Sequence, residues 1–174
     1  MTRKDLAACI FKTSYLRGEF KLRSGQKSNE YFDKYRFESD PELLREIAKK
    51  LTPLIPSKTQ VLAGLEMGGI PIATALSLES GLPLCFVRKA AKEYGTMKLA
   101  EGADIHGKKI CVIEDVITTG GQVIESVDLL RKAGAEIADV LCVIDREQGG
   151  RDKLQAAGLW LQSLFKMTEL KETL

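Results

Sequence analysis

The sequence has little of what redox, metal-binding and membrane proteins need. Its four cysteines form no Cys-x-x-Cys pair, and three of them lie in apolar runs, so we expect buried free thiols and a reducing compartment. The single histidine, His106, lies in the turn-like stretch DIHGKK and is expected to have no catalytic role. No apolar run approaches the roughly 18 residues of a membrane helix, and the N-terminal stretch is too polar for a signal peptide. We therefore expect a cytoplasmic protein without membrane contact.

An excess of charge of one sign is also lacking. The 26 Lys and Arg residues nearly balance the 24 Asp and Glu residues, and the basic residues form no tight patch. This balance does not favour nucleic acid as a partner. With 44% hydrophobic residues, the 174 residues suffice for one domain with a buried core. We expect a single domain over residues 1–174.

Short apolar stretches alternate with helical patterns over most of the chain. Strands are predicted at residues 60–65, 84–87, 109–116, 138–144 and 159–165, and helices at residues 3–13, 41–51, 70–80, 121–132 and 152–157. Ser39 or Asp40 can cap the helix that starts at Pro41. Continuously apolar strands separated by helices are typical of an α/β fold with a doubly wound, mostly parallel sheet flanked by helices, whose ligands bind at the carboxyl ends of the strands.

Two segments do not follow this alternation. The N-terminal polar stretch GEFKLRSGQKSNEYFDKYRF contains only two short strand candidates, at residues 20–22 and 31–33. Residues 88–108 form a long polar connection with no obvious helix, and connections of this kind are often functional lids. Glycines at 95, 102 and 107 are candidate hinges for such a lid.

The stretch VIEDVITTGGQ, residues 112–122, predicts a ligand site. A buried strand ends in Glu114 and Asp115, and a Thr-Gly turn then leads into a helix, where backbone N–H groups and the helix dipole can hold a phosphate. Carboxylates accept hydrogen bonds from sugar hydroxyls, so the arrangement would span a ribose 5-phosphate. Neither a Walker loop nor a Gly-x-Gly-x-x-Gly pattern is present. The alternative is a solvated acid pair followed by an ordinary turn.

These residues resemble a known family. VIEDVITTGG is similar to the motif that binds 5-phosphoribosyl 1-diphosphate (PRPP) in type I phosphoribosyltransferases. The stretches FKLRSGQKSNEYFD, FVRKAAKEYG and VIDREQGG resemble the orotate phosphoribosyltransferases in particular, and GLEMGGIPIAT matches their Gly-rich turn near the pyrophosphate. The likeness covers about residues 5–165. It implies the type I phosphoribosyltransferase fold, with residues 1–38 as a small N-terminal hood of short strands and helix, and residues 88–108 as a mobile active-site loop.

The resemblance implies transfer of a phosphoribosyl group from PRPP to orotate, giving orotidine 5-phosphate and pyrophosphate in pyrimidine synthesis. It assigns catalysis to Asp115, Lys92 and Lys89. It assigns PRPP binding to Arg23, Arg88, Lys89, Lys92, Glu114, Asp115, Val116, Ile117, Thr118, Thr119, Gly120, Gly121 and Gln122. Orotate binding falls to Thr118, Arg146, Tyr31 and Phe32. Mg²⁺ is expected mainly through PRPP, with no direct protein ligand, and a homodimer with shared active sites is implied, Lys89 reaching the neighbouring subunit.

Several alternatives stay open. Arg88, Lys89 and Lys92 could be a solvated face, Asp145 and Arg146 a surface ion pair, and Tyr31 and Phe32 core packing. Gly68 stands where many relatives have a lysine for the pyrophosphate, and Tyr94 replaces a common histidine of the mobile loop. The other functions to consider are a purine phosphoribosyltransferase and a non-catalytic regulator that senses PRPP.

Overall fold

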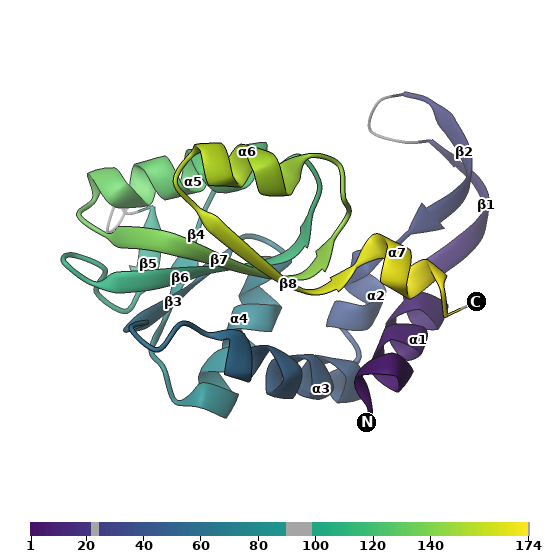
Figure 1. The fold of residues 1–174 in the computed structure, drawn as a ribbon, viewed down its shortest axis with the longest axis horizontal. Coiled ribbons are helices and arrows are strands. Elements are labelled where there is room, and N and C mark those ends of the chain that lie inside the picture. The colour runs from purple at the N-terminus through teal and green to yellow at the C-terminus, as the bar shows by residue number, and fades with distance from the viewer. Residues whose placement is uncertain (22–24, 90–98, 174) are drawn as a thin grey trace.

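The fold is built around a six-stranded sheet flanked by helices on both faces (Figure 1). The structure is a computed structural model that describes residues 1–21, 25–89 and 99–173. The strand order is β5-β4-β3-β6-β7-β8. The strands are β3 (Val61–Leu65), β4 (Leu84–Val87), β5 (Ala100–Gly102), β6 (Lys109–Ile117), β7 (Glu136–Asp145) and β8 (Trp160–Lys166). All neighbouring pairs are parallel except β4 and β5, which confirms the predicted doubly wound, mostly parallel sheet.

The strands read as continuously apolar because both faces of the sheet are covered. On β6, Cys111 and Ile113 pack into one core cluster with α3 (Pro41–Leu51) and α4 (Gly69–Ser80). The alternate residues, Ile110 and Val112, pack into a second cluster with α5 (Gly121–Lys132) and α6 (Gly150–Ala156). Figure 1 shows the two helix pairs on opposite faces. Side chains on a strand alternate between faces, so β3, β4, β6, β7 and β8 each contribute to both clusters.

Local sequence signals set the ends of the main helices. Asp40 caps α3, since its carboxylate accepts from the backbone N–H groups of Glu42 and Leu43 at 2.9 and 3.1 Å. Helix α4 ends at Gly81, whose φ of +74° is the left-handed conformation that favours glycine. The predicted helix over 121–132 is confirmed as α5, and the predicted strand over 84–87 is confirmed as β4.

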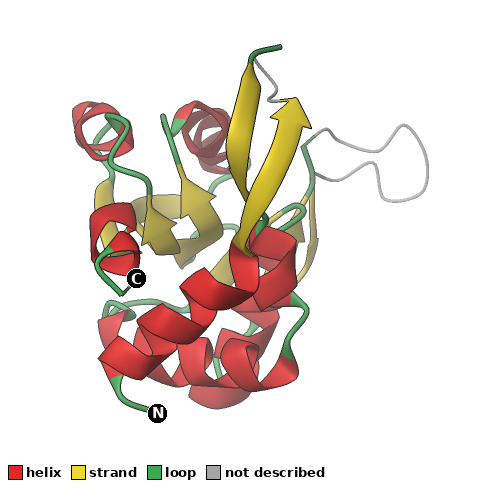
Figure 2. Ribbon diagram, turned by 90° about the vertical axis from the view of Figure 1, so that its right-hand side faces the viewer, coloured by secondary structure: helices red, strands yellow, loops and turns green. Residues whose placement is uncertain are grey.

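The N-terminal segment contains more regular structure than expected. Helix α1 (Arg3–Ser14) leads into an antiparallel hairpin of β1 (Tyr15–Lys21) and β2 (Lys27–Phe32), and a short helix α2 (Lys34–Glu38) follows. The short strand candidates at 20–22 and 31–33 were therefore too brief, because the polar hairpin has no alternating apolar pattern to reveal its length. Figure 2 shows the hairpin standing in front of the strand ends, separate from the main sheet.

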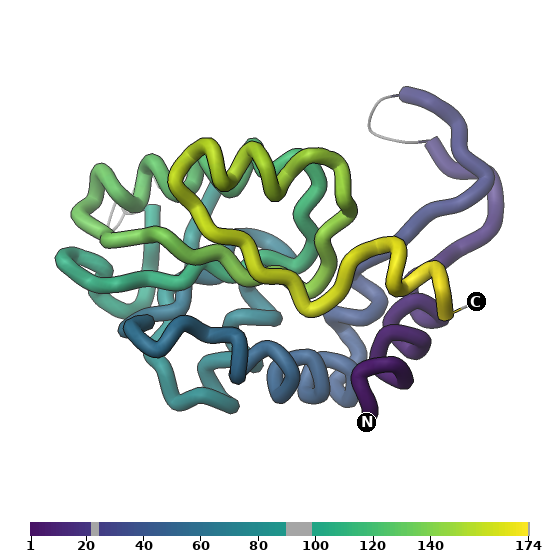
Figure 3. The backbone as a smooth tube through the Cα atoms, viewed as in Figure 1, coloured from purple at the N-terminus to yellow at the C-terminus, as the bar shows by residue number. Residues whose placement is uncertain are grey.

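The C-terminal helix α7 (Met167–Lys171) brings the two ends of the chain together. Arg3 Nη2 lies 2.8 Å from Glu169 Oε1 and also donates to the carbonyl of Leu164, so the C-terminal segment is fastened to α1. The tube in Figure 3 shows the C-terminal segment lying beside α1. Thr168, in the first turn of α7, donates its backbone N–H to Glu147 Oε2 at 3.0 Å.

The connection over 88–108 is also more ordered than predicted, in the part that the structure describes. Residues 100–102 form β5, an edge strand antiparallel to β4. Gly102 faces Cys85 in this pairing, and Gly107 donates its N–H to the carbonyl of Gly134. These two glycines are anchored and do not suit the hinge role expected for them; Gly95 lies outside the described residues. His106 lies in a turn, as expected.

Two further expectations concern the cysteines and membrane-spanning helices. Cys85, Cys111 and Cys142 are buried free thiols, as predicted, while Cys9 is half-buried. Burial raises the pKa of the Cys85 thiol to about 11. Among the described residues, no helix has the length and apolar character that crossing a membrane demands.

Candidate active site

The predicted acid pair lies at the carboxyl end of the central strand β6. Asp115 is fully buried, and its Oδ1 accepts from the backbone N–H of Val116. Glu114 is half-buried, and its Oε2 atom is enclosed without a hydrogen-bond partner. Parallel strands place their carboxyl ends along one edge of the sheet, so this position also meets the ends of β3 and β7. The acid pair is therefore a structured site and not a solvated strand end.

A cation from the N-terminal segment compensates the charge of Asp115. Lys34 Nζ, at the start of α2, lies 2.5 Å from Asp115 Oδ2, and its side chain is 33% exposed while that of Asp115 is buried. Burial would lower the pKa of Lys34, but the charge of Asp115 outweighs this and raises it. Lys34 therefore stays charged next to Asp115.

Two further carboxyl groups close to Asp115 hold protons more tightly than usual. Burial raises the pKa of Glu38 to about 9, and its hydrogen bond with Asp115 adds to the rise. Burial also raises the pKa of Glu114 to about 8, with a further contribution from the charge of Asp115. Carboxyl groups that share a site cannot all ionise without strong repulsion. At neutral pH the site therefore holds two acids that favour the neutral form, Glu38 and Glu114, next to the ion pair of Asp115 and Lys34.

The turn after β6 lines a cavity of about 380 Å³. It is lined by Glu114, Val116, Ile117, Thr118, Thr119, Gly120, Gly121, Gln122, Val123 and Glu125. Gly120 precedes α5 with a φ of +72°, and no side chain caps the helix. Its first intrahelical bond runs from Ile124 N–H to the Gly120 carbonyl, so the preceding N–H groups are available to a ligand. The predicted phosphate loop and the acid Glu114 thus line one cavity.

A second cavity of about 240 Å³ lies between the hairpin and the C-terminal helix. It is lined by Phe11, Tyr15, Ser28, Glu30, Tyr31, Phe32, Arg146, Met167 and Lys171. Three of the four residues expected at orotate, Tyr31, Phe32 and Arg146, are thus brought together. Thr118, the fourth, lines the phosphate cavity instead. The backbone N–H of Arg146 donates to the carbonyl of Ile117 at 2.8 Å, so the two cavities share a wall.

The two aromatic residues of this cavity are placed differently. Tyr31 is 43% exposed and stacks on Phe20, with ring centroids 5.4 Å apart. Phe32 packs between Phe11 and Phe37 against the core. Core packing, the alternative for both residues, therefore applies to Phe32, although Phe32 also lines the cavity. The exposed Tyr31 ring can still stack on a planar ligand.

Arg146 has no partner for its buried Nε atom, because its neighbour Asp145 is engaged elsewhere. Asp145 Oδ2 lies 3.1 Å from Arg151 Nη2, and Asp145 Oδ1 accepts from the N–H of Glu147 at 2.9 Å. The alternative of an ion pair between Asp145 and Arg146 is wrong. A guanidinium that is half-buried beside an aromatic ring is suited to a planar carboxylate.

The basic residues expected at the pyrophosphate follow β4. Arg88 donates its backbone N–H to Leu99 and keeps a buried Nε without a partner. Lys89 is exposed, and its N–H donates to Glu66 Oε1 at 2.9 Å, which connects it to the Gly-rich turn after β3. Arg23, Lys92 and Tyr94 lie outside the described residues.

The structure adds site residues that sequence reasoning missed. Lys34 and Glu38 approach Asp115 from α2, while Tyr15, Met167 and Lys171 line the cavity of Arg146. One signal was available for the first two: Lys34 and Glu38 are spaced by four residues, which places them on one face of a helix. The others had no signal, since they meet Arg146 only through the packing of α1 and α7.

Comparisons with known proteins agree with this geometry. The phosphoribosyl transferase domain family matches residues 37–157. An orotate phosphoribosyltransferase of Nocardioides sp. is 51% identical over 165 residues, which cover 95% of this chain and 92% of that protein. One from Methanocella arvoryzae is 46% identical, over 88% of this chain and 87% of that protein.

Solved structures give the same result. Orotate phosphoribosyltransferase of Mycobacterium tuberculosis H37Rv, in complex with PRPP, matches with a TM-score of 0.84 at 28% identity, covering 97% of this chain and 98% of that one. The Aeropyrum pernix orotate phosphoribosyltransferase matches with a TM-score of 0.83 at 30% identity, covering 96% of both chains. The present chain belongs to the phosphoribosyltransferase family, in its orotate phosphoribosyltransferase branch.

Proposed function

We propose that this protein transfers the 5-phosphoribosyl group of PRPP to orotate, which gives orotidine 5-phosphate and pyrophosphate in de novo pyrimidine synthesis. The observation that carries the proposal is the shared wall of the two cavities. The phosphate cavity of Thr118–Gln122 adjoins the cavity that holds the free guanidinium of Arg146. A donor with a phosphate and an acceptor with a planar carboxylate would meet at this wall.

Different residues would bind different parts of the two substrates. The N–H groups and hydroxyls from Thr118 to Gln122 hold the 5-phosphate. Glu114 and Asp115 face the ribose. Arg146 pairs with the orotate carboxylate, and Tyr31 stacks on its ring. A ring nitrogen of orotate bonds to C1 of the ribose while the bond from C1 to the pyrophosphate oxygen breaks. The electron pair of that bond leaves with the pyrophosphate, and the proton of the orotate ring nitrogen passes to the pyrophosphate.

Electrostatics would lower the barrier of this step. Positive charge develops on the ribose as the pyrophosphate departs, and the ionised carboxylate of Asp115 stabilises it. Arg88, Lys89 and Lys92 stabilise the negative charge of the pyrophosphate, and Arg23 also approaches PRPP. A bound Mg²⁺ neutralises part of the diphosphate charge. This ion would be held mainly by oxygen atoms of PRPP.

The remaining expectations belong to the same proposal. We place residues 1–174 in a single catalytic domain in the cytoplasm, with residues 1–38 as a hood. The loop expected over residues 88–108 would close over PRPP; residues 90–98 lie outside the described residues, and residues 100–102 form the edge strand β5. The protein works as a homodimer in which Lys89 reaches the neighbouring active site. Closure would exclude water and limit hydrolysis of PRPP.

The test is the loss of orotate absorbance when PRPP and Mg²⁺ are added to the purified protein. Adenine, hypoxanthine and uracil are run alongside, with pyrophosphate release as the readout. We expect consumption of orotate alone, and a fall of about 100-fold or more in kcat for Asp115→Asn. We expect Arg146→Ala to raise the KM for orotate by about 10-fold or more.

Two results would contradict the proposal. Reaction with a purine and not with orotate would keep the donor site and reject the base. PRPP binding without reaction of any base would assign the protein to the regulators. Both variants are compared with the wild type by thermal unfolding, so that loss of fold is not read as loss of function.

A further inference from the structure

Lys34 holds a position next to the catalytic acid that no other described cation shares. Its Nζ lies 2.5 Å from Asp115 Oδ2. Glu38 lies one helical turn further along α2 and also interacts with Asp115. Helix α2 therefore presents one positive and one acidic side chain to a carboxylate that belongs to the central sheet.

The turn after β3, which contains Gly68, explains why the positive charge beside Asp115 comes from α2. A Cβ atom at Gly68 would lie 1.6 Å from Asp115 Oδ2 and 3.0 Å from Glu38 Oε1. No residue with a side chain fits at position 68 while Asp115 and Glu38 keep their positions. Any positive charge beside Asp115 must come from another element, and among the described residues Lys34 supplies it.

The position of Lys34 also indicates which substrate group it would meet. Gly68 follows β3, and β3 lies between β6 and β4. Arg88 and Lys89 follow β4, whereas Thr118–Gln122 lead from β6 into α5 and Arg146 follows β7 on the other side. Lys34 contacts Asp115 where the turn after β3 approaches it, and it therefore lies toward the side of Arg88. Its 33% exposure leaves the ammonium group able to leave Asp115 and meet a ligand.

We propose that Lys34 is a binding residue for the diphosphate of PRPP, held by Asp115 in the free protein and released when the ribose occupies Asp115. In the free state the ammonium group neutralises the buried carboxylate. In the bound state the ribose hydroxyls donate to Asp115, and Lys34 turns to the nearest anion, which is the diphosphate. Lys34 thereby provides from α2 the charge that Gly68 cannot carry. This inference rests on the function proposed above.

The test measures binding of two ligands without orotate, by isothermal titration calorimetry in the presence of Mg²⁺. PRPP carries the diphosphate, and ribose 5-phosphate lacks it. We expect Lys34→Met to weaken PRPP binding by about 10-fold or more and to leave ribose 5-phosphate binding unchanged or tighter, because a competitor for Asp115 is removed. Lys34→Arg should keep most of the PRPP affinity.

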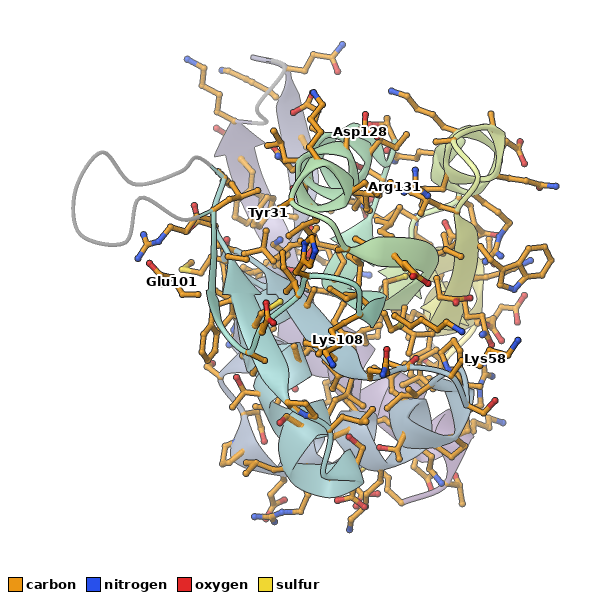
Figure 4. The ribbon with its side chains drawn as sticks, turned by 90° about the vertical axis from the view of Figure 1, so that its left-hand side faces the viewer. Tyr31, Lys58, Glu101, Lys108, Asp128 and Arg131 are labelled. Atoms are coloured by element: carbon orange, nitrogen blue, oxygen red, sulfur yellow. The ribbon has the colours of Figure 1, made fainter. Side chains whose placement is uncertain are left out.

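Lys58→Met is the matched control, since it makes the same change of charge far from the site. Lys58 is exposed and lines a separate cavity with Lys109 and Glu136, at the amino ends of the strands (Figure 4). It should bind both ligands as the wild type does.

Two outcomes would overturn the inference: unchanged PRPP binding in Lys34→Met, or an equal loss for both ligands, which would make Lys34 merely structural. Thermal unfolding checks the fold of each variant, and Lys34→Gln replaces Lys34→Met if the latter does not fold. If the wild type binds PRPP and shows the Lys34 effect but no base reacts, the proposed function fails and the binding role stands. If orotate reacts and the Lys34 effect is missing, only the binding role fails.

Discussion

Asp115 differs from its neighbouring acids in what surrounds it. Lys34 Nζ lies 2.5 Å from the Asp115 carboxylate, whereas burial favours the neutral forms of Glu38 and Glu114. A single fixed negative charge suits a ribose that becomes positive during the reaction. The sequence predicted the pair Glu114 and Asp115 but could not assign different charges to them, because the difference comes from residues that meet only in the folded chain.

The raised pKa values predict how stability depends on pH. The pKa of Glu38 rises from 4.5 to about 9 on folding, so the folded protein binds more protons than the unfolded chain between these values. The free energy of unfolding should therefore fall as pH rises from about 5 to 9. Glu38→Gln should make this decline shallower, as measured by urea unfolding at several pH values.

Glu136→Gln is the control for this series. Glu136 is exposed at the start of β7, at the opposite end of the sheet from the acid pair. Glu136→Gln should show the same decline of the free energy of unfolding with pH as the wild type. An unchanged slope in Glu38→Gln would mean that Glu38 does not hold its proton in the folded protein.

At the scale of elements, the loop between β6 and α5 depends on the conformation of one glycine. Gly120 has a φ of +72°, and a Cβ there would lie 3.2 Å from Leu154 Cγ. Gly120→Ala should cost about 1–2 kcal/mol of unfolding free energy, since the left-handed conformation is unfavourable for alanine. It should also raise the KM for PRPP by roughly 10-fold, because the backbone N–H groups move away from the phosphate.

Gly81→Ala separates the two effects. Gly81 has a φ of +74° at the end of α4, and a Cβ there would meet nothing within 4 Å. This variant should lose a similar free energy of unfolding without any change in the KM for PRPP. If both variants raise that KM equally, the phosphate loop has no special role.

Helix α7 is the element whose contribution the sequence left open. Its residues Met167 and Lys171 line the cavity of Arg146, and Glu169 of the same helix forms an ion pair with Arg3. The helix thus places a second positive charge close to the group that would bind the orotate carboxylate. Five residues of modest amphipathicity carry no sign of this in the sequence.

Substituting Lys171 tests that contribution. Lys171→Met should raise the KM for orotate roughly 5- to 10-fold and leave the KM for PRPP unchanged, as expected for one exposed charge-assisted contact. Steady-state kinetics with each substrate varied in turn measures both constants. A change in the KM for PRPP alone would mean that Lys171 contributes to binding of PRPP and not of orotate.

At the scale of the whole molecule, the site combines segments from most of the chain. The hairpin β1–β2 and α2 come from the N-terminal 38 residues, the phosphate loop follows β6, and α7 ends the chain. Figures 1 and 2 show these segments gathered at the carboxyl ends of the strands. The proposed homodimer would complete the site with Lys89 from the partner.

Mixing two inactive variants tests the shared site. Lys89→Ala and Asp115→Asn remove groups that the proposal places on different subunits of one active site. In a hybrid dimer one site would lack both groups and the other would be intact, so random mixing should restore about a quarter of the wild-type activity. The mixture is unfolded, refolded together and assayed with orotate and PRPP. No recovery in a mixture shown to be dimeric would mean that each site belongs to one subunit.

The sequence by itself determined the sheet and the phosphate loop. Both are local in origin: apolar strands such as β4 and β6 are continuous because both faces are buried, and the Thr-Gly turn after Asp115 binds anions through its own backbone. The partners of the acids were decided only by the tertiary structure. Lys34 and Asp115 are 81 positions apart, and Asp145 pairs with Arg151 and leaves Arg146 free. Such choices depend on how helices and strands pack, because a side chain interacts with what is close in space and not with what is close in the chain.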